Sequence, residues 1–135
     1  MSRKRVLVAD DLAPVLSTVA ALLRESFDVV GTVSDGRAAL EATLKLQPDL
    51  VVLDISMPLM SGIEVAEELT RQGNKAKIVF LTVHEDQDIL STCRAAGGLG
   101  YVIKVLMDTD LVLAMNEALA GHAFTSCFPS DEDMH

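Results

Sequence analysis

Three aspartates stand directly after apolar runs of the chain, where a carboxylate can bind a metal or act as a nucleophile. Asp10 and Asp11 follow the run Val6–Ala9, and Asp54 follows the run Leu50–Leu53. If both runs are buried parallel strands, their carboxyl ends bring the three acids to one edge of a sheet. Clustered carboxylates repel one another unless a cation lies among them. The arrangement therefore predicts a hard divalent metal bound by oxygen, and we expect Mg²⁺.

A hydroxyl and an ammonium group follow two further apolar runs. Thr82 comes directly after residues 78–81, and Lys104 comes directly after residues 100–103. A carboxylate nucleophile, a metal, a hydroxyl donor and an ammonium group are the parts that transfer a phosphoryl group, whose oxygens gather charge in the transition state. We expect Asp54 to be the acceptor, because it lies in the middle of the site and is ionised at neutral pH without a base.

The elements that position these residues follow from the hydrophobic pattern. Apolar runs of four to six residues alternate five times with segments of helical period, which predicts a parallel sheet with helices on both faces. Right-handed crossovers favour the doubly wound order 2-1-3-4-5, with ligands at the carboxyl ends of the strands. We therefore predict a three-layer α/β fold with five parallel strands, near residues 4–9, 28–33, 49–53, 77–82 and 100–103.

Helix signals occur in each connecting segment. Asp11 is placed to cap the first helix, and Ser34 or Asp35 the second. Ser61 and Glu64 have the spacing of a capping box and predict the start of the third helix. The five helices are expected near residues 12–23, 35–44, 61–72, 86–96 and 108–121.

The bulk properties predict one acidic domain. The chain has 135 residues, a formal net charge of −9 and a pI near 4.6, which argue against direct binding to nucleic acid. No apolar run approaches the roughly 18 residues that a membrane span needs. The apolar run Val6–Ala9 is also shorter than the apolar core of a signal peptide, which has roughly 7–15 residues. We expect a cytoplasmic domain over residues 1–122 and a mobile tail over 123–135. Cys93 and Cys127 are expected to be ordinary thiols.

The order and spacing of these motifs resemble the receiver domain of two-component response regulators, the CheY-like family with a flavodoxin-like fold. The resemblance extends over residues 4–121. It rests on an acid pair after the first strand, an acid followed by a Met-Pro loop, a strand-end threonine and a strand-end lysine. These motifs occupy residues 6–11, 54–62, 82 and 100–104.

The resemblance assigns a role to each residue of the site. Asp54 takes a phosphoryl group from the phosphohistidine of a sensor histidine kinase or a phosphotransfer protein. Asp10, Asp11, Asp54 and the backbone carbonyl of Ser56 bind Mg²⁺, and Lys104 pairs with the acceptor. The chain is then a signalling domain that catalyses only its own phosphorylation and dephosphorylation, and it is not an enzyme acting on a metabolite.

Thr82 and Tyr101 form the switch that the resemblance implies. Thr82 moves to hydrogen-bond the phosphoryl oxygens, and Tyr101 turns inward into the space that Thr82 leaves. A phosphoryl group adds about −1.5 to −2 charges, which shifts a population only if two packings engage the oxygens differently. The switched surface is expected to bind a downstream protein, an attached output domain or a second copy of the chain. His84, close to Thr82, is expected to be an exposed loop residue.

The chain departs from the family pattern at two positions. Val105 follows Lys104 where the family often has a proline after a cis peptide bond, and a cis bond before a non-proline residue costs roughly 2.5–4 kcal/mol. Receivers of LuxR and nitrate-response regulators commonly lack that proline, and residues 118–121 resemble theirs. Because no DNA-binding domain lies within the 135 residues, the chain is either a stand-alone receiver or part of a longer protein. Val83, at a position that is usually small in the family, is expected to slow the access of water or small phosphodonors to Asp54.

Three other classes of function share parts of this pattern. A hydrolase of the haloacid-dehalogenase type would carry a second aspartate where this chain has Ser56. A flavodoxin-like electron carrier would hold a phosphate in its first loop, where Asp10 and Asp11 would repel it. A degenerate receiver that acts only as a phosphorylation-independent docking module would fit the departures at Val83 and Val105. The apolar stretch 105–107 indicates a partner surface in either kind of receiver.

Overall fold

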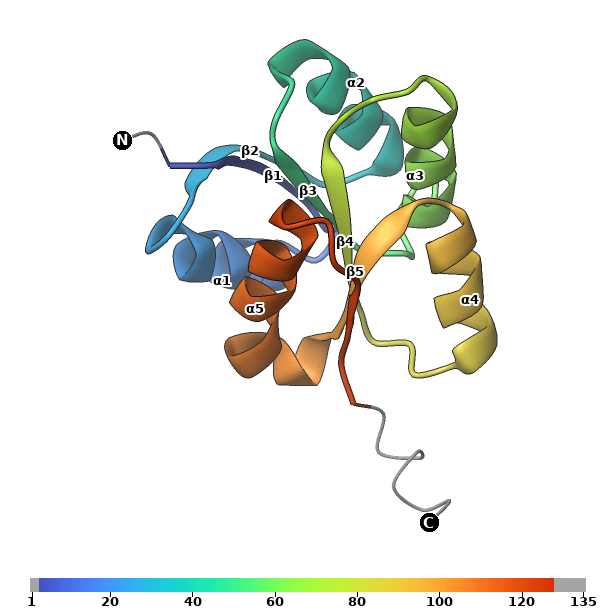
Figure 1. Ribbon diagram of the computed structural model, residues 1–135. Helices are drawn as coiled ribbons and strands as arrows, with labels where there is room; N and C mark the ends of the chain where they lie inside the picture. The colour runs from blue at the N-terminus through green and yellow to red at the C-terminus, as the bar shows by residue number, and fades with distance from the viewer. Residues whose placement is uncertain (1–2, 128–135) are drawn as a thin grey trace.

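The computed structural model describes residues 3–127 as a parallel β-sheet between two layers of helices (Figure 1). The strands lie in the order β2-β1-β3-β4-β5-β6, and each neighbouring pair is parallel. This order confirms the predicted doubly wound α/β fold. The strands are β1 Arg5–Ala9, β2 Asp28–Val33, β3 Leu50–Leu53, β4 Lys77–Thr82, β5 Gly98–Ile103 and β6 Phe124–Thr125.

Five α-helices cover the two faces of the sheet. In Figure 1, α1 and α5 lie on one side of the sheet, and α2, α3 and α4 lie on the other. Across residues 3–127, no helix combines the length and the apolar content that crossing a membrane requires. The helices are α1 Ala13–Arg24, α2 Gly36–Leu46, α3 Gly62–Arg71, α4 Gln87–Ala95 and α5 Met107–Leu119, and a 3₁₀ turn, η1 Lys104–Leu106, precedes α5.

The central strands are buried on both faces, which explains their continuous apolar runs. In β1, Val6 and Val8 belong to the core under α1 and α5, whereas Leu7 and Ala9 belong to the core under α2, α3 and α4. All four residues of β3 are buried. Since neither face meets water, each strand lacks a polar side until it reaches the edge of the sheet. The first polar residues after β1 and β3 therefore mark the edge where a site can form.

Local side-chain contacts fix where the helices begin. Asp35 caps α2 by accepting a hydrogen bond from the backbone of Ala38 at 2.7 Å, and Ser61 and Glu64 form the predicted capping box of α3. The prediction that Asp11 caps the first helix is wrong. Leu12 is the residue before α1 and makes no side-chain cap.

The reason lies in the preceding aspartate. Asp10 Oδ1 accepts a hydrogen bond from the backbone nitrogen of Leu12 at 2.9 Å, while Asp11 is exposed. The turn after β1 is therefore closed by Asp10, and Pro14 in the first turn of α1 has no N–H group that needs a cap.

The sixth strand is a correction to the predicted tail. Phe124 and Thr125, expected to be the start of a mobile segment, pair with Gly100 and Tyr101 at the outer edge of β5. Phe124 packs against the core under α1 and α5, and Ser126 is buried. The edge of β5 offers unpaired backbone groups, and this short segment satisfies part of them. The rest of the predicted tail, residues 128–135, lies outside the described residues.

Candidate functional site

The three aspartates meet at the carboxyl edge of the sheet, as predicted. Strands β1 and β3 are neighbours in register, so that Ala9 lies beside Leu53, and the backbone nitrogen of Asp54 donates to the carbonyl of Ala9 at 3.0 Å. One carboxylate oxygen from each of Asp10, Asp11 and Asp54 lies within 4.8 Å of the others. Asp10 and Asp54 are buried, at 2% and 5% exposure, while Asp11 is exposed. The cluster is thus open to solvent on one side.

Lys104 joins this cluster from the end of β5. Its Nζ lies 2.8 Å from Asp10 Oδ2 and 3.1 Å from Asp54 Oδ2, and its side chain is only 11% exposed. Burial by itself lowers the pKa of Lys104, but the contacts and charges of Asp10 and Asp54 outweigh burial and raise the pKa overall. Lys104 therefore stays charged and neutralises part of the acid cluster.

The surroundings of Asp54 disfavour the charged form of its carboxyl group. Burial raises its pKa most, and the negative charge of Asp10 raises it further, against the opposing effects of Lys104 and of the Ile55 backbone. The Ile55 nitrogen donates to Asp54 Oδ1 at 2.7 Å. A single lysine thus does not compensate two buried carboxylates, and a further positive charge would stabilise the cluster.

The donor set fits a hard divalent cation. The cluster offers carboxylate oxygens, which Mg²⁺ and Ca²⁺ prefer. Asp10 Oδ2 is buried and makes no hydrogen bond of good geometry within residues 3–127, although it pairs in charge with Lys104. A buried carboxylate oxygen with an unused lone pair is suited to a metal. Ser56 is exposed in the loop after β3, and its carbonyl as a further ligand stays a prediction.

Thr82 and Tyr101 lie next to the site on β4 and β5. Both residues are fully buried. Thr82 Oγ1 accepts a hydrogen bond from the backbone nitrogen of His84 at 3.2 Å, and the Tyr101 hydroxyl donates to the carbonyl of His84 at 2.8 Å. Burial raises the pKa of Tyr101 to about 12, so the hydroxyl stays protonated as a donor. Tyr101 already points inward in this structure, and its predicted movement stays a prediction.

His84 is half-buried, so the prediction of an exposed loop residue is wrong. Its backbone contacts both Thr82 and Tyr101. Its Nε2 also lies 3.4 Å from Ser56 Oγ, which connects the loop after β4 with the loop after β3. The only signal in the sequence was its position two residues after Thr82, at the same edge of the sheet.

The loop after Lys104 takes a regular form. The described residues contain no cis peptide bond, so Val105 follows Lys104 through a trans bond and begins η1 with it. Val105 is 83% exposed, whereas Leu106 and Met107 are half-buried and pack against the two cores. The predicted apolar partner surface is therefore limited to Val105 within the stretch 105–107.

Exposed apolar side chains recur around the acid cluster. Leu12, Leu59, Val83 and Val105 are between 51% and 83% exposed. Each lies in a different loop, after β1, β3, β4 and β5 respectively, and these are the strands that carry the site residues. We call these four residues the apolar rim. Single exposed apolar residues are common on proteins, but one in every loop of a site indicates a surface for a partner.

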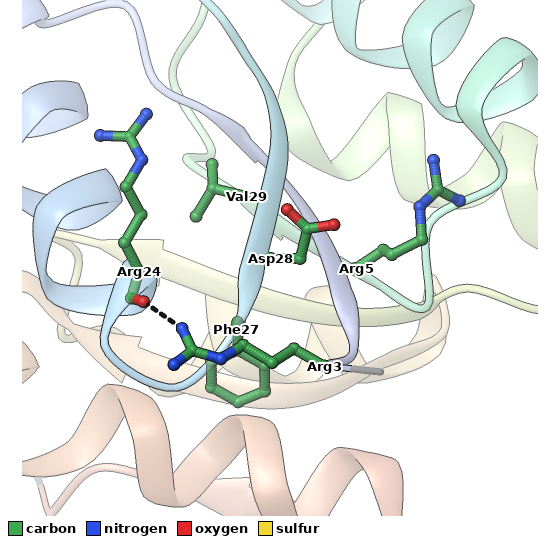
Figure 2. A pocket seen from close by; sticks show the side chains of 6 residues that line it. All are labelled: Arg3, Arg5, Arg24, Phe27, Asp28 and Val29. Carbon is green, nitrogen blue, oxygen red and sulfur yellow. Dashed lines mark hydrogen bonds between the residues drawn. The ribbon is translucent and has the colours of Figure 1, made fainter. Parts of the chain in front are cut away.

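One cavity of the described chain lies away from this site. It has a volume of about 640 Å³ and is lined by Arg3, Arg5, Arg24, Phe27, Asp28 and Val29 (Figure 2). Arg5 and Asp28 begin β1 and β2, so the cavity lies at the opposite edge of the sheet from the aspartates.

The arginines of this cavity do not form an anion site. Arg5 donates to the carbonyls of Leu46 and Gln47, and Arg3 donates to the carbonyl of Arg24 at 2.6 Å. Figure 2 shows the three guanidinium groups apart from one another, with no common point toward which they converge. The cavity therefore takes no part in the chemistry of the acid cluster.

Comparison with known proteins identifies the family. The family described as "Response regulator receiver domain" matches residues 6–116. The transcriptional regulatory protein PdtaR of Mycobacterium tuberculosis (strain CDC 1551 / Oshkosh) is 36% identical over 118 residues, which are 87% of this chain and 57% of PdtaR. The chain thus spans little more than half the length of this curated relative.

Solved structures agree with the sequence comparison. The signal receiver domain of the response regulator NarL from M. tuberculosis is 29% identical, with a TM-score of 0.86 over 90% of this chain and 100% of that one. A LuxR-family two-component response regulator from Aurantimonas sp. SI85-9A1 is 27% identical, with a TM-score of 0.86 over 99% of this chain and 100% of that one. These two structures are of the NarL and LuxR type that residues 118–121 resemble. The chain belongs to the response regulator receiver domain family.

Proposed function

We propose that this receiver takes a phosphoryl group onto Asp54 from a phosphohistidine of a sensor kinase or a phosphotransfer protein, in the presence of Mg²⁺. The observation that carries the proposal is the convergence of Asp54 with Asp10, Asp11 and Lys104 at one edge of the sheet. Each group supplies one requirement of the reaction, and all come from strand ends that the core holds in place.

The transfer step can be written from the residues of the site. An Asp54 carboxylate oxygen attacks the phosphorus, a P–O bond forms, and the P–N bond to the donor histidine breaks with its electron pair left on the imidazole nitrogen. Lys104, now 3.1 Å from Asp54, stabilises charge on the phosphoryl oxygens. The Thr82 hydroxyl is the further donor. Mg²⁺ bound by Asp10 and Asp11 would supply the positive charge that shields the incoming phosphoryl group from the acids.

The apolar rim supports a protein as the phosphoryl donor. Leu12, Leu59, Val83 and Val105 surround the acids with apolar side chains that a small phosphodonor does not need. A protein that presents a phosphohistidine on an apolar surface would cover these side chains while it reaches Asp54. The rim thus favours a protein donor, while the acids can perform the chemistry with a donor of either size.

The output is proposed from the relatives. PdtaR is named a transcriptional regulatory protein, and this chain corresponds to part of its length. We propose that the receiver acts in the cytoplasm and passes its state to an attached output domain or a downstream protein. Its own charge of −9 favours protein partners over nucleic acid, so DNA contact would belong to the output partner. The protein catalyses only its own phosphorylation and dephosphorylation in this proposal.

Incubation with acetyl phosphate or phosphoramidate and Mg²⁺, followed by intact mass spectrometry, tests the function. The wild type should gain one phosphoryl group, and Asp54→Asn should gain none. Asp28→Asn, an exposed aspartate at the opposite edge of the sheet, is the matched control and should be modified as the wild type is. An unmodified wild type would favour the docking module without phosphorylation, and a modified Asp54→Asn would move the acceptor elsewhere.

A further inference from the structure

The segment Phe124–Ser126 contacts three elements of the fold at once, and we call it the C-terminal latch. Phe124 and Thr125 extend the sheet beside β5. On the side of α4, Arg94 Nη2 donates to the carbonyl of Phe124 at 3.3 Å and to the hydroxyl of Thr125. The latch therefore crosses the outer edge of the sheet and is held from α4 as well as from β5.

Ser126 is the best-anchored residue of the latch. Its side chain is buried, with only 2% of the residue exposed. Its backbone nitrogen donates to the carbonyl of Tyr101 at 2.9 Å, and its Oγ accepts from the backbone nitrogen of Ile103 at 3.2 Å and donates to Asp110 Oδ2 of α5 at 2.7 Å. A buried hydroxyl that both donates and accepts is costly to replace, so the latch is a specific contact.

Both β5 partners of Ser126 lead directly to the site. Tyr101 donates through its hydroxyl to His84, which in turn donates its backbone N–H to Thr82. Ile103 is covalently joined to Lys104, whose ammonium group contacts the acids. Ser126 thus hydrogen-bonds β5 at two positions, Tyr101 and Ile103, and Ile103 directly precedes Lys104.

We propose that the hydrogen bonding between the C-terminal latch and β5 depends on the chemical state of Asp54, so that phosphorylation of Asp54 weakens these hydrogen bonds. The proposal rests on the proposed function. A phosphoryl group on Asp54 brings new anionic oxygens, and the Lys104 ammonium follows them away from its present position between the acids. In this proposal the backbone at Lys104 shifts with its ammonium group, and the shift acts first on the hydrogen bond from the neighbouring Ile103 to Ser126, which at 3.2 Å is the longest of the three.

Release of the latch exposes a strand edge. The outer side of β5 then offers unpaired backbone groups flanked by α4 and α5, which is a surface for an added strand. The resident occupant of that surface is the chain's own segment Phe124–Ser126, and phosphorylation controls its occupancy.

Thermodynamic linkage predicts a reciprocal effect of the latch on Asp54. If modification of Asp54 weakens the latch, then weakening the latch must favour modification of Asp54 by the same factor. Ser126→Ala removes two of the three hydrogen bonds of Ser126 and leaves the backbone bond to Tyr101. This variant should therefore bind beryllofluoride, a mimic of the phosphoryl group, more tightly than the wild type does. Coupling between sites is typically at least about fivefold.

The test uses the full chain with Mg²⁺ and beryllofluoride. Amide hydrogen exchange is followed by NMR at Thr125 and Ser126 and at the site residues Asp54 and Ile55, with and without the adduct. We expect exchange at the latch to rise about tenfold or more when the adduct forms, and the apparent beryllofluoride affinity of Ser126→Ala to rise about fivefold or more. Ser91→Ala, an exposed serine of α4, is the control and should match the wild type.

The outcomes separate the two proposals. Shifted amide signals at Asp54 and Ile55 with unchanged exchange at the latch would overturn the coupling and leave the proposed function standing. The absence of any shift at Asp54 would remove the proposed function and the coupling with it. If Ser126→Ala fails to fold, Asp110→Asn weakens the same hydroxyl contact from the helix side, and an unchanged beryllofluoride affinity in that variant would also overturn the proposal.

Discussion

Lys104 Nζ lies 3.1 Å from Asp54 Oδ2 across 50 residues of sequence. The same nitrogen lies 2.8 Å from Asp10 Oδ2, so one ammonium group is shared by two buried carboxylates. The fold brings these charges together because β1, β3 and β5 end at the same edge of the sheet. The pairing contributes to the stability of the site and predicts how the site responds to mutation, pH and metal.

Replacing Lys104 by Met should destabilise the metal-free protein. The change leaves two buried carboxylates without their shared cation, and breaking a buried ion pair in this way costs about 3 kcal/mol. Urea unfolding in EDTA at pH 7 measures the loss. Added Mg²⁺ should restore part of it, because a metal replaces the missing positive charge. Lys45→Met, at an exposed lysine of α2, should change stability little. A Lys104→Met protein as stable as the wild type would contradict the shared pairing.

Replacing Asp54 by Asn should stabilise the metal-free protein at neutral pH. Burial and the charge of Asp10 raise the pKa of Asp54 above its ordinary value of 3.8, so the folded state holds this proton more tightly than the unfolded state does. The free energy of unfolding therefore falls as the pH rises past 3.8 and through the folded pKa. Below pH 3.8 the carboxyl group is protonated in both states, and the penalty is absent.

The pH dependence separates this effect from a general gain in stability. The advantage of Asp54→Asn over the wild type should be present at pH 7 in EDTA and vanish at pH 3, as measured by urea unfolding. Asp28→Asn, at an exposed residue far from the cluster, should show no such dependence. A variant that is less stable than the wild type at pH 7 would show that Lys104 outweighs burial and repulsion.

Magnesium should stabilise the wild type and lose its effect when a ligand is removed. A ligand that binds only the folded state at one hundred times its dissociation constant adds about 2.7 kcal/mol to the free energy of unfolding. Thermal unfolding in increasing MgCl₂, reversed by EDTA, measures this gain. Asp10→Asn should reduce it strongly, because Asp10 supplies a buried carboxylate to the cluster. An equal gain in both proteins would place the bound Mg²⁺ outside the acid cluster.

Much of the fold and of the site follows from local sequence patterns. The four central strands are buried on both faces, and their apolar runs end where the site residues begin, so that Asp10, Asp54, Thr82 and Lys104 could be assigned to one edge. The capping box of Ser61 and Glu64 also lies within four residues and could be read directly. Patterns of this kind need no knowledge of distant contacts.

Two features that the sequence did not predict depend on tertiary contacts, and a third depends on a choice between neighbouring residues. β6 has two residues and therefore no periodicity, and it forms because β5 offers a free edge and Ser126 finds buried partners. The sequence gives His84 the features of a loop residue, but in the structure its backbone is hydrogen-bonded to Tyr101 and Thr82. Aspartate is a favoured capping residue, which made Asp11 a candidate, but the neighbouring Asp10 closes the turn by accepting a hydrogen bond from the Leu12 nitrogen. For β6 and His84 a contact between residues distant in sequence decided the structure, whereas at Asp11 a local hydrogen bond two residues long decided it.

The apolar rim predicts that phosphotransfer from a protein and from a small molecule can be separated. Val105 is the most exposed of the four rim residues, at 83%, and Val105→Glu would place a charge where an apolar partner surface docks. Because a buried unpaired charge costs several kcal/mol, transfer from a phosphohistidine protein should slow at least tenfold. Phosphorylation by acetyl phosphate should keep its rate, since Asp54, Thr82 and Lys104 are unchanged. Both rates can be measured on one preparation with radiolabelled donors.

Lys75→Glu, at an exposed residue on the opposite edge of the sheet, controls for added negative charge. Equal slowing with both donors would show that Val105→Glu disturbs Lys104 itself, and no slowing with either would remove the rim from the docking surface.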